Sequence, residues 1–164
     1  MENIKVLSNQ KVIKYLLTIF LGSLVLTISA KIKIPFYPVP MTMQTFVVVL
    51  MGITFGWKIG VATISLYLLE GIIGFPVFAG TPEKGLGLFY FMGHTMGYLI
   101  GFLFAAFLAG YLNLKTNIFL IFLKLILSVS IIYILGILWL GHLIGWDKPL
   151  LELGLMPFLL AELF

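Results

Sequence analysis

The sequence predicts an all-α integral membrane protein, built as one bundle of six transmembrane helices whose last helix is truncated. Hydrophobic residues make up 62% of the 164 residues and charged residues only 10%, whereas an ordinary soluble domain is roughly 25% charged. So few polar side chains cannot cover so much apolar surface in water, so the surrounding solvent must be hydrocarbon. Glycine, proline and lysine also interrupt the apolar sequence about every 20 residues, the length that a spanning helix needs.

The expected spans are residues 12–30, 41–56, 58–75, 88–112, 117–145 and 149–164, all within one domain that covers residues 1–164. The first apolar run is too long for the core of a cleavable signal peptide, so we expect a retained span. In the fourth segment, small residues recur every four positions and predict close helix packing. They are Gly93, Gly97, Gly101 and Ala105. The last segment would be about 24 Å long against a hydrocarbon core of about 30 Å, which indicates a fragment or an impaired protein.

The lysines predict how the chain is oriented in the membrane. With the N-terminus in the cytoplasm, the inner side holds Lys5, Lys11, Lys14, Lys58 and Lys115, and the outer side holds Lys31, Lys33, Lys84 and Lys148. The excess of positive charge on the inner side favours this orientation in the cell membrane. Because the lysines lie at the segment ends without clustering, they suit lipid headgroups better than nucleic acid.

Two loops on the predicted outer side, residues 31–40 and 75–87, combine aromatic residues with proline and glycine. Such loops hold defined turns and let the backbone approach a bound molecule closely. Composition alone leaves two interpretations open: simple helix connectors, or caps over a binding site.

Catalytic patterns are missing from the sequence. It contains no cysteine, no phosphate-binding P-loop and no nucleophile elbow. His94 and His142 lack the spacing of a zinc hydrolase, so we expect no enzyme, no metal site and no cofactor. Glu70 and Glu162 lie in apolar segments, where a carboxylate costs about 3 kcal/mol. Glu70 is close enough to a segment end to reach interfacial water, whereas Glu162 needs a hydrogen-bond donor, which a ligand can supply.

Three motifs stand out in the loops and the helices that they join. They are Pro38-Val-Pro-Met-Thr42-Met-Gln44-Thr45-Phe, Leu66-Tyr67-Leu-Leu-Glu-Gly71-Ile-Ile-Gly74-Phe-Pro76-Val77-Phe78-Ala79-Gly80, and Gly93-His-Thr95-Met-Gly97-Tyr98-Leu-Ile-Gly101-Phe102. These motifs resemble the signature blocks of the BioY family, the biotin-specific S components of energy-coupling factor (ECF) transporters. The resemblance runs from about residue 11 to the end of the chain.

The resemblance implies a biotin-binding subunit that works with a transmembrane T component and two cytoplasmic ATPases. It also implies a ligand cavity that is open to the outer side and capped by the two outer loops. On this basis we expect polar contacts from Gln44, Thr95 and Glu162. We expect aromatic walls from Tyr37, Phe78 and Tyr98, and loop closure allowed by Gly80 and Gly85.

The chain also departs from the family pattern. His94 and Met96 replace a proline and a glycine, and Glu162 stands where the family has an aspartate. The family's lysine one turn later would fall beyond Phe164. Two alternatives therefore stay open: an S component for another vitamin, or a structural membrane protein that binds nothing.

Overall fold

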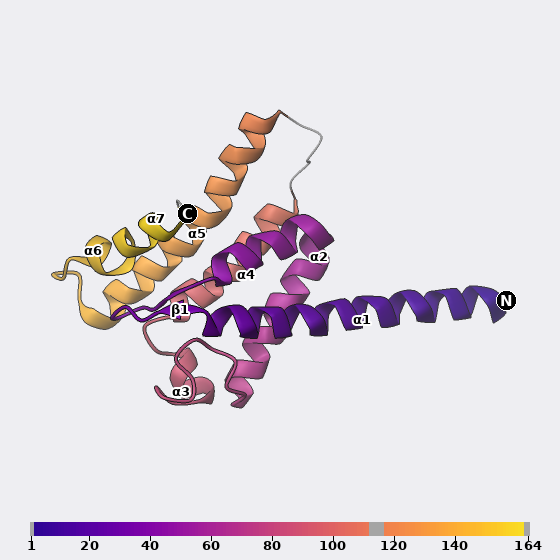
Figure 1. Cartoon of the computed structure of the whole chain (residues 1–164), viewed down its shortest axis with the longest axis horizontal. Helices are drawn as coiled ribbons and strands as arrows, with labels where there is room; N and C mark the ends of the chain where they lie inside the picture. Colours follow the sequence, from indigo (N-terminus) through magenta and orange to yellow (C-terminus); the bar gives the residue numbers. More distant parts are fainter. Residues whose placement is uncertain (1, 112–116, 163–164) are drawn as a thin grey trace.

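The computed structural model describes residues 2–111 and 117–162, and within them the side chains of residues 9–111 and 117–159. The first helix, α1 (Glu2–Lys31), is long and straight, and its N-terminal half projects away from the other helices (Figure 1). Apolar side chains there are widely exposed, such as Leu16 at 61% and Phe20 at 50%. This exposure suits a helix that is surrounded by lipid.

A short hairpin follows α1. Its strands, β1 (Lys33–Ile34) and β2 (Met41–Thr42), pair antiparallel, with Lys33 opposite Thr42 and Ile34 opposite Met41. The prediction of an all-α chain missed this hairpin, whose strands have two residues each. It returns the chain to the start of the next helix, so that the first outer loop lies across one end of the bundle.

The next helix, α2 (Gln44–Ile73), consists of two limbs that meet at a sharp bend (Figure 1). Gly56 forms the bend with φ of 77° and ψ of 165°, a conformation that favours glycine because it has no Cβ. The limbs pack back against each other: a Cβ added to Gly60 would lie 3.1 Å from the Cα of Gly52. The limbs correspond to the predicted second and third spans, and α2 ends at Gly74 in the left-handed region.

The predicted fourth span is interrupted near its start. A short helix, α3 (Gly87–Phe91), precedes α4 (Met96–Gly110), and residues 92–95 between them are not helical. The expected continuous helix over residues 88–112 is therefore wrong before Met96. The interruption lets α3 lie with the outer loop 75–85 instead of extending the bundle.

The fifth span agrees closely with its prediction. It is α5 (Ile118–Ile144), preceded by the capping residue Asn117, whose side chain accepts a hydrogen bond from the amide of Phe119. The predicted sixth span is not one helix. It is interrupted at Leu155, which separates α6 (Leu150–Gly154) from α7 (Met156–Glu162). Both short helices return along α5 (Figure 1).

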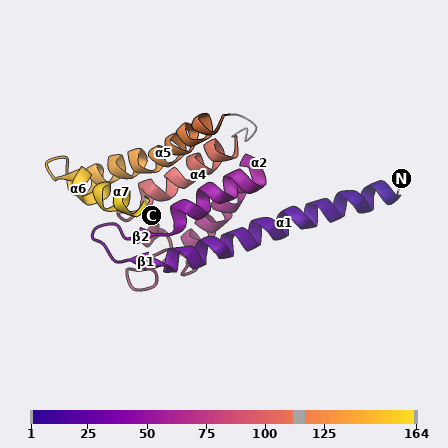
Figure 2. The ribbon, with the colours of Figure 1, turned by 45° about the horizontal axis from the view of Figure 1, so that its top comes forward.

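Helix α4 lies between α2 and α5, and α1 packs on α2 (Figure 2). Glycines allow these close contacts, since an added Cβ on Gly101 would lie 2.7 Å from the Cα of Ile132. Ser23 of α1 hydrogen-bonds to the Glu70 carboxylate of α2 at 3.1 Å. This contact gives Glu70 a partner within the bundle, where the sequence suggested interfacial water.

Within the described parts of the chain, three helices are long and apolar enough to cross a membrane, Asn9–Lys31, Gln44–Ile73 and Ile118–Ile144, and Met96–Gly110 is a shorter apolar helix. These helices confirm the prediction of a mostly helical protein with helices suited to a membrane. The count of six spans stays a prediction.

Candidate functional site

A cavity of about 440 Å³ lies at the end of the bundle where the outer loops meet the helices. Its walls come from the first limb of α2 and the hairpin before it, from α4 and α5, from loop 75–85, and from Phe158 of α7. The described lining residues are mostly apolar and include no charged side chain. Such a space suits a small, largely apolar molecule held by a few polar groups.

One wall of the cavity is an aromatic group anchored by the outer loop. The Phe78 ring stacks on the Tyr90 ring with centroids 5.4 Å apart, and it meets the Tyr67 ring edge-on at 5.4 Å. Phe78 is only 1% exposed, because Gly71 of α2 leaves room for its ring. This fixed packing gives the cavity a rigid wall.

A second aromatic group, formed by Tyr98, Tyr133 and Phe158, also lines the cavity. The Phe158 ring lies 5.9 Å from that of Tyr98 and 5.7 Å from that of Tyr133. The Tyr98 hydroxyl donates a 2.8 Å hydrogen bond to the carbonyl of Gly154, the last residue of α6. This bond stabilises the interruption between α6 and α7, and so helps to position Phe158 at the cavity.

Hydrogen bonds connect Gln44, a polar residue of the cavity lining, to β2, to the second limb of α2 and to loop 75–85. The Thr42 hydroxyl donates to the Gln44 amide oxygen at 3.2 Å, and the Gln44 amide nitrogen donates to the Tyr67 hydroxyl at 2.7 Å. Tyr67 in turn donates to the carbonyl of Val77 at 3.3 Å. Since an amide nitrogen has two hydrogens, Gln44 keeps one for a ligand while this chain fixes its orientation.

The hydroxyl of Tyr90 is a second polar group in the lining of the cavity. Its hydroxyl accepts a 2.9 Å hydrogen bond from the amide of Gly80 and also hydrogen-bonds to the side chain of Thr95. Burial raises the pKa of Tyr90, more than these hydrogen bonds lower it, so the phenol is neutral at physiological pH.

Two lysines hold loop 75–85 over the cavity. The Lys31 ammonium donates to the carbonyls of Phe78 and Thr81, both at 2.8 Å, and the Lys33 ammonium donates to the carbonyl of Ala79 at 2.6 Å. We refer to these contacts as the lysine clamp. The clamp joins the first outer loop to the second, and hydrogen bonds from a charged donor are among the stronger ones.

A second pocket, called the outer pocket below, adjoins the cavity. Both spaces are lined by Pro40, Tyr90 and Thr95. The outer pocket is further lined by Tyr37, Pro38, Lys84, Leu88, Phe89, Met92, Gly93 and His94. It therefore differs from the inner cavity in having a cationic side chain and an imidazole.

Comparison with known proteins identifies the family. The model of the BioY family matches residues 3–164, nearly the whole chain. The chain belongs to the BioY family.

Curated relatives agree with this assignment. The chain is 33% identical over 137 residues to the probable biotin transporter BioY of Pyrococcus horikoshii, covering 84% of this chain and 80% of that one. It is 34% identical over 139 residues to the biotin transporter BioY of Thermotoga maritima, with the same coverage of both chains. Both relatives are named as biotin transporters, the first as a probable one, and the BioY family is a family of transporter components and not of enzymes.

A solved structure has the same fold. The S-component for biotin from an ECF-type ABC transporter, determined at 2.1 Å, superimposes with a TM-score of 0.74 at 27% identity, over 94% of this chain and 84% of that chain. The BioY fold therefore extends through the region that surrounds the cavity.

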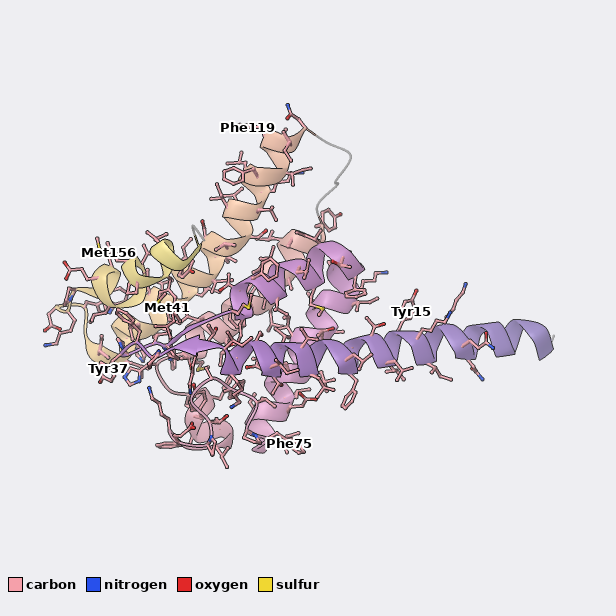
Figure 3. The ribbon with its side chains drawn as sticks, in the orientation of Figure 1. Tyr15, Tyr37, Met41, Phe75, Phe119 and Met156 are labelled. Atoms are coloured by element: carbon pink, nitrogen blue, oxygen red, sulfur yellow. The ribbon has the colours of Figure 1, made fainter. Side chains whose placement is uncertain are left out.

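The structure brings four of the predicted site residues of this BioY protein to the inner cavity: Gln44, Phe78, Thr95 and Tyr98. Tyr37 lies elsewhere, in the outer pocket, and is 77% exposed (Figure 3). Gly80 and Gly85 do not line either space. Gly80 supports Tyr90 instead, and Gly85 forms a turn with φ of 103°. The side chain of Glu162 lies outside the described residues.

Sequence reasoning missed several lining residues of the BioY cavity, notably Tyr90, Tyr133 and Phe158. Phe158 had a usable signal, because it lies one helical turn before Glu162, which was a predicted contact. Tyr90 and Tyr133 had none, since aromatic residues are common along all the apolar segments.

Proposed function

We propose that this BioY protein captures biotin from the outer side of the cell membrane, as the substrate-binding subunit of an ECF-type vitamin transporter. The observation that carries the proposal is the inner cavity, whose apolar walls hold a few oriented polar groups at the outer end of a BioY fold. Its volume of about 440 Å³ falls within the roughly 300–1,000 Å³ typical of small-molecule sites.

Biotin combines features that match such a cavity. Its fused rings carry a ureido group with two N–H donors and a carbonyl acceptor, and the remainder is hydrocarbon and a thioether. The free hydrogen of the Gln44 amide can donate to the ureido carbonyl, and the Thr95 hydroxyl can accept from a ureido N–H. Phe78 and Tyr98 then form the two aromatic walls around the ring system. Glu162 is proposed as a further acceptor for the ureido group.

The proposed orientation places the N-terminus, the bend at Gly56 and Lys58 on the cytoplasmic side. Loop 75–87 then lies outside, where it meets the ligand first. The proposed partners are a transmembrane T component and two cytoplasmic ATPases, which supply the energy for release inward. Expressed alone, the protein is expected to bind biotin without accumulating it in an ATP-dependent way.

Binding of labelled biotin to the purified protein tests the proposal, with unlabelled thiamine and riboflavin as competitors. We expect saturable binding that excess biotin displaces and the other two vitamins do not. Displacement by thiamine or riboflavin instead would favour an S component for another vitamin. Absence of binding to any of the three would favour the non-binding alternative.

A further inference from the structure

The inner cavity leaves one part of the proposed ligand without a partner. Biotin ends in a carboxylate on an aliphatic chain, which is ionised at neutral pH. None of the described residues that line the inner cavity is charged. Burying a carboxylate there would be costly without a cation or several hydrogen bonds, so the carboxylate is expected to lie outside the inner cavity.

The described lysines near the outer loops differ in their availability. Lys31 and Lys33 donate to the loop carbonyls of the clamp. Lys148 lies 3.7 Å from the carboxylate of Asp147. Lys84 has no ion-pair or hydrogen-bond partner for its ammonium group within the part of the chain that the structure describes, and it lines the outer pocket.

The outer pocket is placed to receive the end of a ligand that lies in the inner cavity. The two spaces share Tyr90 and Thr95 as lining residues. A ligand whose rings lie beside Thr95 in the inner cavity would therefore have the end of its chain next to the outer pocket, at the wall that the two spaces share. His94 also lines this pocket, with its ring 6.3 Å from that of Tyr37. Glu83 is next to Lys84 in the sequence but does not line the pocket.

We propose that the outer pocket is the subsite for the carboxylate of the ligand, with the Lys84 ammonium as its cation and His94 as a second donor. This inference rests on the proposed function. It fixes the direction of the ligand, with the ureido rings inside and the carboxylate towards the outer solvent. The hydrocarbon chain then passes the aromatic ring of Tyr90, at the wall that the two spaces share.

The test compares biotin with biotinamide, which has the same rings and chain but no charge, on the purified full chain in nanodiscs. The variant Lys84→Met keeps the length of the side chain and removes its charge. We expect this variant to weaken biotin binding by about threefold to tenfold, as for a partly exposed charge pair, and to leave biotinamide binding unchanged. Lys84→Arg should restore biotin affinity. Lys148→Met is the matched control, because Lys148 lines neither space, and it should change neither affinity.

Salt provides a second readout. The difference in affinity between biotin and biotinamide should shrink in the unmodified chain as the NaCl concentration rises, and should be absent in Lys84→Met. An equal loss for both ligands in Lys84→Met, or no loss for either, would overturn the inference while leaving the proposed function intact. Failure of the unmodified chain to bind biotin at all would refute the proposed function, and this inference with it.

Discussion

The amide of Gln44 donates a 2.7 Å hydrogen bond to the hydroxyl of Tyr67, which joins the two limbs of α2 across the bend at Gly56. Gln44 is 3% exposed and Tyr67 is fully buried. The bond fixes which way the amide faces, and it costs Gln44 only one of its two hydrogens. The same side chain can therefore support the helix and contact a ligand.

Substitution of Gln44 should separate these two roles. Gln44→Leu removes the contact to the ligand, and we expect biotin affinity to fall by about 10-fold or more, since an unpaired buried polar group costs about 1–3 kcal/mol. Tyr67→Phe removes only the orienting hydroxyl, so the loss should be smaller. Isothermal titration calorimetry gives both affinities. Equal losses in the two variants would mean that Gln44 acts only through the helix.

Removal of the lysine clamp should loosen loop 75–85. Lys31→Met takes away the donor to the carbonyls of Phe78 and Thr81, so the loop loses two charge-assisted hydrogen bonds. We expect faster hydrogen exchange at residues 78–85 and biotin affinity lower by about threefold to tenfold. Lys148→Met serves as the control. Unchanged exchange in the loop would contradict the role of the clamp.

The packing of α4 on α5 should depend on Gly97. A Cβ at this position would overlap the backbone oxygen of Leu135 and the Cβ of Trp139. Gly97→Ala should therefore lower the free energy of unfolding by about 1–3 kcal/mol, visible as a lower Tm in detergent. Phe104→Ala on the same helix changes a side chain that is 51% exposed, and it should have the smaller effect. A wild-type Tm for Gly97→Ala would show that α4 and α5 can move apart freely.

The proposed orientation can be tested because the chain contains no cysteine. Glu83 is exposed in the outer loop, and Lys58 is exposed beside the bend in α2. On intact cells, a membrane-impermeant maleimide should label Glu83→Cys and not Lys58→Cys. Labelling of both variants after the membrane is opened is the control. The reverse pattern on intact cells would invert the topology.

The sequence predicted the long helices well because their signal is strong and local. The run from Ile118 to Ile144 is almost wholly apolar, and Asn117 precedes it as a capping residue. The bend at Gly56 was also within reach, since a glycine there divides two apolar segments. These features are set by residues that are close together in the sequence, so they can be predicted from it.

The breaks at residues 92–95 and at Leu155 were not predictable in the same way. The sequence around Leu155 is apolar throughout, and the break there depends on the Tyr98 hydroxyl, which satisfies the carbonyl of Gly154 from another helix. Tyr37 was likewise predicted as a wall of the site because it lies in the first loop. In the structure it lies near His94 and lines the outer pocket instead. Such tertiary contacts override local periodicity.

The bend in α2 also bears on the order in which the site forms. The hydrogen bond from Gln44 to Tyr67 closes a loop of only 23 positions, while that from Tyr98 to Gly154 spans 56. Contacts of short sequence separation cost less entropy to close and tend to form sooner. The contact between Gln44 and Tyr67 therefore lies within a helical hairpin whose residues are close in sequence, whereas the aromatic side around Phe158 is completed only when the end of the chain returns to it.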